Sequence, residues 1–281
     1  MPVDRLLLCT DMDRTVIPNG HQLEHPDARP RFRQLCSLAE VRLVYVSGRH
    51  LQLVQQAISD YDLPQPDYAI TDVGTKIYQQ VHGKWHEMLN WQQHIARDWQ
   101  GKTPTQLQEA LQDFPELALQ EHHKQSNFKL SYYLPLSADK DKILAAVATK
   151  LTQLGVDASL IWSVDEPENI GLLDILPRNA TKLEAIQFLQ HQLGYAQHEV
   201  IFAGDSGNDM PVLASSIQSI VVANAAPEIK QQAQRLTQQR GCESTLYLAD
   251  DASPLGGNYA AGVVQGVLFF APQIGTKLEL T

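Results

Sequence analysis

Short apolar runs alternate with segments of helical periodicity in the first part of the chain. The apolar runs are Arg5–Thr10, Val41–Val46 and Tyr68–Thr71, and runs of this length are typical of strands buried in a parallel sheet. Between them, His25–Glu40 and His50–Tyr61 repeat apolar residues at the spacing of a helix. Strand and helix in this alternation predict a parallel α/β sheet.

A different pattern occupies the middle of the chain, from residue 81 to residue 168. Val81-His82-Gly83 marks a hairpin turn, and Phe128–Leu134 alternates in the manner of an antiparallel strand. Asp139–Leu154 has helical periodicity, and Ser159–Val164 has the pattern of another strand. These elements predict a small α+β domain inserted into the parallel sheet.

The parallel pattern resumes after this insert. It continues through three apolar runs and two helical segments, which are Leu172–Leu176, Val200–Ala203, Ser219–Val222, Thr181–Leu193 and Tyr259–Phe270. We therefore expect an α/β fold with a Rossmann-like core of residues 1–80 and 169–281, built on a parallel sheet, and an inserted α+β cap domain at residues 81–168.

Composition and net charge exclude several classes of protein. Of the 281 residues, 43% are hydrophobic and 19% are charged, as in a globular chain. The 22 basic and 32 acidic residues leave a formal charge of -10, which opposes nonspecific binding of nucleic acid or anionic lipid. No apolar stretch approaches the ~20 residues of a membrane span, and the start of the chain does not resemble a signal peptide. We expect a cytoplasmic protein with no nucleic acid or membrane as partner.

Two acidic residues, Asp11 and Asp13, directly follow the first predicted strand. Open parallel sheets bind their ligands beyond the carboxyl ends of the strands, and unpaired carboxylates are costly to bury. In a chemical interpretation, Asp11 attacks phosphorus as a nucleophile, and Asp13 serves as general acid and then as general base. A solvated acidic loop or the start of a helix accounts for the pair equally well.

A second acidic cluster, Gly204–Asp209, follows another predicted strand. The carboxylates of Asp205 and Asp209 and the amide of Asn208 are hard oxygen ligands, which suit Mg²⁺. An Asx-rich turn explains the glycines and the asparagine, but it does not explain two further acids. If both acidic clusters share one crevice, their mutual repulsion calls for a divalent cation.

Ser47 and Lys182 are weaker signals. Ser47 follows the second predicted strand, where its hydroxyl and the N–H groups of the turn could hold phosphate oxygens, although ordinary turn chemistry explains it too. Lys182 opens a predicted helix, which is a slightly unfavourable place for a cation and suggests an anionic neighbour. A lysine on the surface is the simpler interpretation of that position.

These positions, taken in chain order, resemble the four motifs of the haloacid-dehalogenase-like phosphatases. The matching segments are Asp11-Met12-Asp13-Arg14-Thr15, Ser47, Lys182 and Gly204–Asp209. The resemblance implies a catalytic Lys182 that also binds phosphate together with Ser47.

The same resemblance implies Mg²⁺ as the cofactor. The cation would be held by the Asp11 carboxylate, the backbone carbonyl of Asp13 and Asp205, and Asp209 would support the metal or its waters. Arg14 departs from the family pattern, which usually has a small or polar residue there, and the sequence leaves its partner open.

Four further segments narrow the resemblance to sucrose-phosphate phosphatases and related sugar phosphatases. They are Thr71–Thr75, Phe128–Tyr132, Leu173–Pro177 and Tyr259–Val263. We expect the cap to determine which sugar is accepted, because the core handles only the phosphate. The candidate substrate-binding residues are Arg49, Lys129 and Asn208.

The sequence thus predicts an enzyme, a Mg²⁺-dependent phosphatase for a small sugar phosphate, with sucrose 6-phosphate as the first choice of substrate. Mannosylfructose phosphate, glucosylglycerol phosphate and mannosyl-3-phosphoglycerate are alternative substrates. A phosphosugar mutase and a noncatalytic binding module remain alternatives from other classes. The glycosyltransferase that makes the substrate is the candidate protein partner.

Overall fold

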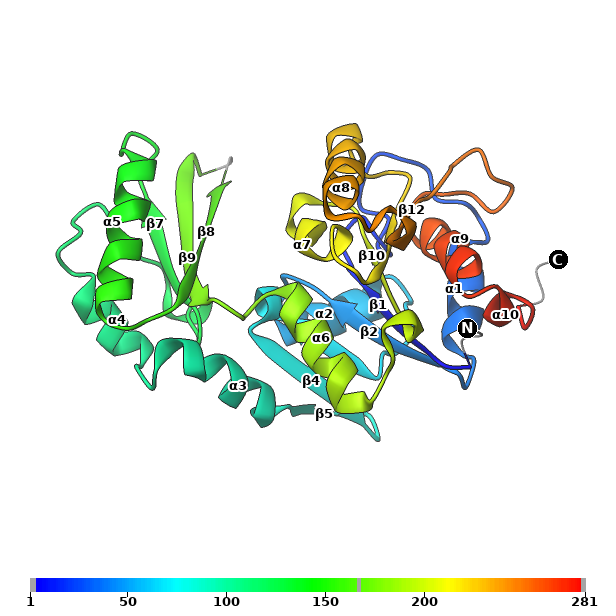
Figure 1. Ribbon diagram of the computed structural model, residues 1–281, viewed down its shortest axis with the longest axis horizontal. Helices are drawn as coiled ribbons and strands as arrows, with labels where there is room; N and C mark the ends of the chain where they lie inside the picture. The colour runs from blue at the N-terminus through cyan, green and yellow to red at the C-terminus, as the bar shows by residue number, and fades with distance from the viewer. Residues whose placement is uncertain (1–3, 166–167, 279–281) are drawn as a thin grey trace. The chain divides into compact units, whose positions relative to one another are not determined.

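The computed structural model describes residues 4–165 and 168–278, and these form two compact units (Figure 1). The larger one, the core unit, runs up to Glu87 and resumes at Lys182. The smaller one, the cap unit, comprises Met88–Thr181. Each unit has its own sheet and its own buried apolar cluster, so each is described by itself.

An eight-stranded sheet forms the centre of the core unit, in the order β12-β11-β10-β1-β2-β3-β4-β5. Its strands are β1 (Leu6–Thr10), β2 (Val41–Val46), β3 (Tyr68–Thr71), β4 (Lys76–Val81), β5 (Lys84–Glu87), β10 (Val200–Gly204), β11 (Gln218–Val221) and β12 (Leu246–Leu248). The strands from β12 to β3 pair in parallel, and β4 and β5 add an antiparallel hairpin at one edge. The predicted α/β fold is therefore confirmed.

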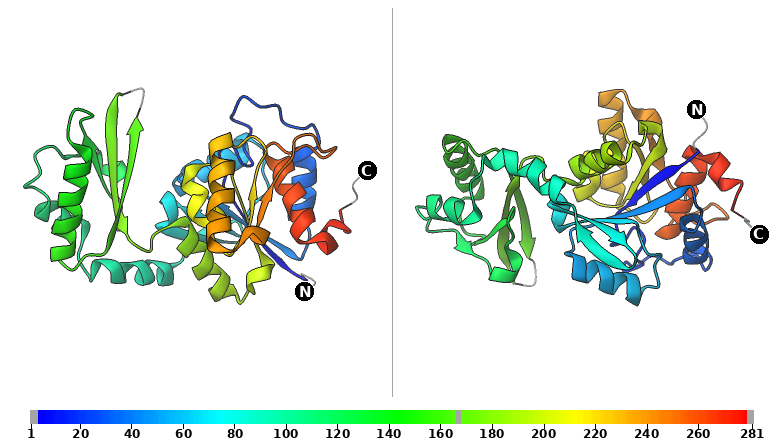
Figure 2. Two further views of the ribbon diagram at one scale, coloured as in Figure 1. Left: turned by 45° about the horizontal axis from the view of Figure 1, so that its top comes forward. Right: turned by 90° about the horizontal axis from the view of Figure 1, so that it is seen from below.

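Helices cover both faces of this sheet. They are α1 (Ala28–Cys36), α2 (Leu51–Asp60), α6 (Lys182–Leu193), α7 (Met210–Leu213), α8 (Pro227–Arg240), α9 (Ala260–Phe270) and α10 (Pro272–Gly275). Leu6 and Leu8 of β1 belong to one cluster with Phe32 of α1 and Val263 of α9, and Figure 2 shows these two helices side by side. Leu7 of β1 points to the opposite face and is also fully buried. A strand covered on both faces needs an uninterrupted apolar run, which is what β1 has.

The cap unit has a four-stranded antiparallel sheet, and the last two α-helices of the unit pack against one face of it. The strand order is β6-β7-β9-β8, with β6 (Ala118–Leu119), β7 (Leu130–Leu134), β8 (Ala158–Asp165) and β9 (Ile170–Pro177), and the helices are α3 (Leu89–Ala96), α4 (Pro104–Ala110) and α5 (Lys140–Gln153). Leu130 and Leu134 of β7 pack in one cluster with Val147 of α5. Ser131 and Tyr133 alternate with these residues and therefore point to the other face. No helix in the described part of either unit is long and apolar enough to span a membrane.

The boundaries between the two units lie later in the chain than the sequence analysis places them. The cap unit begins at residue 88 rather than 81 and ends at residue 181 rather than 168. The hairpin of β4 and β5 belongs to the core because β4 pairs with β3. The assignment of Leu172–Leu176 to the core sheet is wrong, because β9 pairs with β7 and β8 in the cap. Its apolar run reflects a central position in the smaller sheet.

The sequence analysis also missed α8 and β12. Only Ala233 and Thr237 are buried among the 14 residues of α8, so this glutamine-rich helix has almost no apolar periodicity to recognise. The strand β12 has 3 residues, all half-buried, and such a short strand carries no clear alternation. The helix predicted over His25–Glu40 is shorter, because α1 covers only Ala28–Cys36.

Candidate active site

The site lies where three neighbouring strands of the core sheet end. The strands β10, β1 and β2 are adjacent, so the residues that follow them gather at one edge of the sheet. The chain leaves β1 with a hydrogen bond from the Asp11 N–H to the carbonyl of Ala203 in β10, 2.8 Å long. Ser47 follows β2 in the same way, and its N–H donates to the carbonyl of Ile70 in β3. This pairing fixes the backbone on which the acidic residues are carried.

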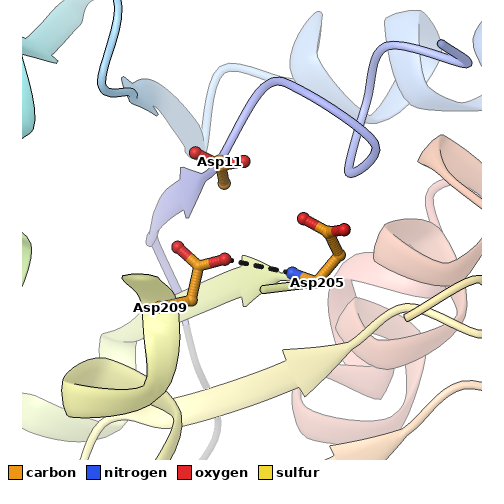
Figure 3. Close-up of side chains that lie close together, drawn as sticks. All are labelled: Asp11, Asp205 and Asp209. Atoms are coloured by element: carbon orange, nitrogen blue, oxygen red, sulfur yellow. Dashed lines mark hydrogen bonds between the residues drawn. The ribbon is translucent and has the colours of Figure 1, made fainter. Parts of the chain in front are cut away.

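Three buried carboxylates, those of Asp11, Asp205 and Asp209, meet at this edge (Figure 3). One oxygen of each lies within 4.8 Å of the others. Burial raises the pKa of Asp11 from 3.8 to about 7, and the charge of Asp209 adds to this rise although Lys182 opposes it. Burial and the charge of Asp209 also raise the pKa of Asp205, from 3.8 to about 6. Three hard oxygen donors that repel one another fit a divalent cation such as Mg²⁺.

Lys182 is a buried counter-ion of this cluster. As the first residue of α6, it places its Nζ 2.8 Å from Asp11 Oδ1 and 2.7 Å from Asp209 Oδ1. Burial alone lowers the pKa of this ammonium, but the two carboxylates raise it above its ordinary value. Lys182 is thus fixed as a cation between two acids, and the interpretation as a surface lysine does not hold.

Asp209 holds the loop that presents Asp205. Its Oδ2 accepts hydrogen bonds of 3.1 Å from the N–H groups of Asp205 and Ser206 and from the Ser206 hydroxyl. Figure 3 marks the first of these bonds. Gly204 makes this close approach possible, because a Cβ there would lie 2.6 Å from the Asp209 carboxyl group. The predicted role of Asp209 in supporting a metal site stays a prediction.

The carboxylate of Asp13 is paired with Arg49 and Asn19. Arg49 donates to it from Nε at 2.8 Å and from Nη2 at 2.6 Å, and the amide of Asn19 donates at 2.8 Å. The hydrogen bonds from Arg49 are the main cause of a pKa below the ordinary value, opposed by partial burial. The carboxylate of Asp13 therefore stands outside the three-carboxylate group, and only its backbone carbonyl was expected to bind the metal.

Arg14 has a partner that the sequence did not indicate. Its Nε donates to Asp205 Oδ2 at 3.1 Å, and its Nη2 donates to the carbonyl of Asn224 at 3.2 Å. The Thr15 hydroxyl approaches the other oxygen of Asp205 at 3.4 Å. The sequence analysis placed Thr15 in the first motif but gave it no role. It missed Asn224, because no pattern around Asn224 separates it from an ordinary turn residue.

A cavity of about 450 Å³ opens onto these groups. Its lining includes all the core residues predicted for the site except Asp209, namely Asp11, Asp13, Ser47, Arg49, Lys182, Asp205 and Asn208. The Ser47 hydroxyl accepts from the N–H of Arg49 at 3.1 Å, which orders the turn. Acids, cations and a hydroxyl around one cavity are the groups needed to bind a phosphate with a divalent cation.

Lys129, the remaining candidate, belongs to the cap unit. Its Nζ lies 3.3 Å from Asp174 Oδ2, and the Ser131 hydroxyl donates to the other oxygen of that carboxylate. Lys129 is therefore one member of a polar cluster with Asp174 and Ser131, and it does not stand as an isolated cation.

Comparison with known proteins identifies the family. A family model for sucrose-6F-phosphate phosphohydrolase matches residues 4–271. The chain belongs to this family. The predicted haloacid-dehalogenase-like phosphatase is thereby confirmed as the class of this enzyme, which acts on sugar phosphates.

Individual relatives agree with this family. A protein of Nitrosococcus oceani, described only as a hydrolase of the haloacid-dehalogenase-like class, is 46% identical over 98% of this chain and 74% of its own length. The mannosylfructose-phosphate phosphatase of Agrobacterium fabrum is 30% identical over 79% of this chain and 85% of its own. Sucrose-phosphatase 1 of Nicotiana tabacum is also 30% identical, over 81% of this chain, but the match spans only about half (52%) of the tobacco protein.

Solved structures show the same fold. The sucrose-phosphatase of Synechocystis, solved with sucrose and phosphate, has a TM-score of 0.69 at 23% identity and covers 96% of this chain and 98% of its own. A haloacid dehalogenase-like hydrolase of Bacillus subtilis has a TM-score of 0.68 at 16% identity, and the match covers 96% of this chain and 93% of the other.

We expect Mg²⁺ to raise the melting temperature more at pH 8 than at pH 5. Folding raises the pKa of Asp11 from 3.8 to about 7 and that of Asp205 from 3.8 to about 6. Because the folded-state values lie above the unfolded ones, the protein in EDTA loses stability as the pH rises through this interval. If Mg²⁺ binds the ionised carboxylates, it should restore the lost stability at the higher pH. Thermal unfolding in EDTA and in excess Mg²⁺ at both pH values measures the difference.

Asp205→Asn is the control for this experiment. It removes one of the two shifted acids, so the melting temperature in EDTA should fall less steeply with pH than in the parent protein. An equal gain from Mg²⁺ at pH 5 and pH 8 in the parent would contradict the expectation.

Proposed function

We propose that this phosphatase hydrolyses its sugar phosphate with the help of Mg²⁺, through an aspartyl-phosphate formed on Asp11. The observation that carries the proposal is the environment of the Asp11 carboxylate. It is buried beside Asp205 and Asp209, paired with Lys182 at 2.8 Å, and lines the cavity. A carboxylate beside a fixed cation and open to a cavity has the setting of a nucleophile.

The reaction would proceed in two displacements at phosphorus. An oxygen of Asp11 attacks, the bond between phosphorus and the sugar oxygen breaks, and that oxygen takes a proton from Asp13. A water then attacks the same phosphorus, gives its proton to Asp13, and releases inorganic phosphate and the free Asp11 carboxylate. Ser47 and Lys182 would hold the phosphate oxygens, since both line the cavity.

Mg²⁺ would be held by the carboxylates of Asp11 and Asp205 and by the backbone carbonyl of Asp13, with Asp209 fixing the loop. When bound, it would offset the charge of the phosphate so that an anionic nucleophile can approach it. Asp209 has both oxygens occupied, one by Lys182 and one by the loop N–H groups, which favours the supporting role.

Arg49 would control the protonation of Asp13. The paired guanidinium keeps the Asp13 carboxylate ionised, whereas a general acid must carry a proton when the sugar leaves. Arg49 also lines the cavity, so an incoming phosphate would compete with Asp13 for it. If the Arg49 guanidinium moves from Asp13 to the phosphate, the pKa of Asp13 would rise. Asp13 could then carry the proton that a general acid needs.

Sucrose 6-phosphate is the substrate that we propose first, since the family model that matches almost the whole chain is that of the sucrose-6F-phosphate phosphohydrolases. The mannosylfructose-phosphate phosphatase of Agrobacterium fabrum makes mannosylfructose phosphate the specific alternative. Glucosylglycerol phosphate is a further candidate substrate, because the chain also matches a glucosylglycerol-phosphate synthase, with 29% identity over 27% of that protein.

The cap would select the sugar through the sheet face that its helices leave uncovered. Lys129, Ser131 and Asp174 form a hydrogen-bonded polar cluster there. Tyr133, on the same face of β7, accepts a hydrogen bond from Lys124 at 2.8 Å. Paired acids and bases beside an aromatic ring suit sugar hydroxyls, which both donate and accept.

A panel of sugar phosphates assayed for phosphate release with Mg²⁺ tests the function. We expect the highest kcat/KM on sucrose 6-phosphate and a loss of several orders of magnitude in Asp11→Asn, which keeps the shape but removes the nucleophile. Phosphorus NMR of the products separates release of phosphate from an isomerised sugar phosphate, the product of a mutase. Activity of Asp11→Asn within tenfold of the parent would refute the covalent mechanism.

Lys129→Ala tests the role of the cap. Loss of a charged hydrogen-bond donor, worth up to about 3 kcal/mol, should lower kcat/KM for the preferred sugar phosphate roughly tenfold to a few hundredfold. Hydrolysis of p-nitrophenyl phosphate, which has no sugar, should change little.

Lys150→Ala is the matched control for Lys129→Ala. Lys150 is also a lysine of the cap unit paired with an aspartate, at 3.5 Å from Asp113. Its loss should leave both substrates unaffected. Equal losses on the two substrates in Lys129→Ala would mean that Lys129 supports the fold of the cap rather than the choice of sugar.

A further inference from the structure

Hydrogen bonds to the backbone of Arg14 hold this cation beside the three buried carboxylates. It has a left-handed φ of 58°, its N–H donates to Asn19 at 2.8 Å, and its carbonyl accepts from the amide of Asn224 at 2.6 Å. Asn224 is itself held, since its side-chain oxygen accepts from the N–H of Tyr259 at the start of α9. A residue other than glycine in this conformation needs such support.

The guanidinium of Arg14 reaches the one carboxylate of the cluster that Lys182 does not contact. Lys182 lies between Asp11 and Asp209, whereas Arg14 donates to Asp205 Oδ2 at 3.1 Å. Asp205 is 5% exposed, so its charge would be costly without a partner. The two cations together give each of the three buried carboxylates a counter-ion.

We propose that Arg14 is the resident counter-ion of Asp205, which stabilises the site without a divalent cation and weakens the binding of Mg²⁺. The proposal rests on the proposed Mg²⁺ site. The physical reason is competition: Arg14 and Mg²⁺ are both attracted to the Asp205 carboxylate, and they repel each other when both are present. By linkage, a group that interacts more favourably with the protein when the metal is absent lowers the affinity for the metal.

This role and a purely structural one predict effects of opposite sign. If Arg14 only oriented Asp205 as a ligand, its removal would weaken Mg²⁺ binding, as the loss of such outer partners commonly does. If it competes, its removal strengthens binding. The Arg14 side chain is 41% exposed, so solvent screens the repulsion and the effect should be moderate.

The test is calorimetric titration of Mg²⁺ into the full chain at pH 8, without substrate. We expect Arg14→Ala to bind Mg²⁺ roughly three- to tenfold more tightly than the parent. Arg14→Lys keeps the charge and should bind within about twofold of the parent. In EDTA, Arg14→Ala should melt below the parent, and excess Mg²⁺ should narrow the gap. Arg14→Gln, which also lacks the charge, repeats the measurement if the alanine variant does not fold in EDTA.

Arg29→Ala is a closely matched control within the core unit. Arg29 likewise donates to one carboxylate, Glu24 at 2.9 Å, and to one backbone carbonyl, that of Tyr61, and its side chain is 38% exposed. Its removal should lower the melting temperature without changing the affinity for Mg²⁺.

Each outcome decides the role of Arg14. Unchanged or weaker Mg²⁺ binding in both Arg14→Ala and Arg14→Gln overturns the proposal, and weaker binding would assign Arg14 to orienting Asp205. A parent protein that binds no Mg²⁺ overturns the proposed metal site, and this proposal with it. A parent that binds Mg²⁺ but does not release phosphate from sugar phosphates overturns the proposed function and leaves the role of Arg14 measurable.

Discussion

Repulsion among buried carboxylates is the constraint that organises this site. Asp11, Asp205 and Asp209 each place one carboxylate oxygen within 4.8 Å of the others, at 6%, 5% and 0% exposure. Unpaired, such charges would cost more than a domain of this size can spare, because its net stability amounts to about 5–15 kcal/mol. Lys182 and Arg14 offset that cost from two sides. The two cations make the burial of these acids possible.

The fold produces this convergence through strand order. Since β10, β1 and β2 are neighbours in a parallel sheet, residues far apart in sequence end at one edge. The small residue at Gly204 then lets Asp209 fold back under the loop and hold Asp205 in place. Lys182 enters from α6, whose first residue it is. Backbone geometry thus brings these residues to one edge, and hydrogen bonds of their side chains then hold the loops in place.

The dependence of the site on strand order explains which parts of it the sequence could predict. Asp11, Ser47 and Asp205 each follow an apolar run, so an expected parallel sheet was enough to bring them together. The partners of Arg14 and Asp13 could not be predicted, because they depend on a left-handed turn and on Asn19, which no periodicity marks. The boundary of the cap was misplaced for a related reason: a central strand of a small sheet, β9, has the same apolar run as a strand of the core.

The net charge of the site bears on how strongly it would attract a metal ion and a phosphate. When all four carboxylates are ionised, counting Asp13, the three cations Lys182, Arg14 and Arg49 leave the site one charge negative. A divalent cation would make it one charge positive, and a phosphate dianion would return it to one negative, or to neutrality once Asp13 carries the proton of a general acid. The site would therefore stay within one charge of neutrality at every stage, which avoids the cost of a larger net charge around its three buried carboxylates. Without Arg14, a site that holds Mg²⁺ would be neutral and would attract the phosphate dianion less strongly. On the role proposed for Arg14, the cation that weakens Mg²⁺ binding would also strengthen the attraction for the substrate once Mg²⁺ is bound.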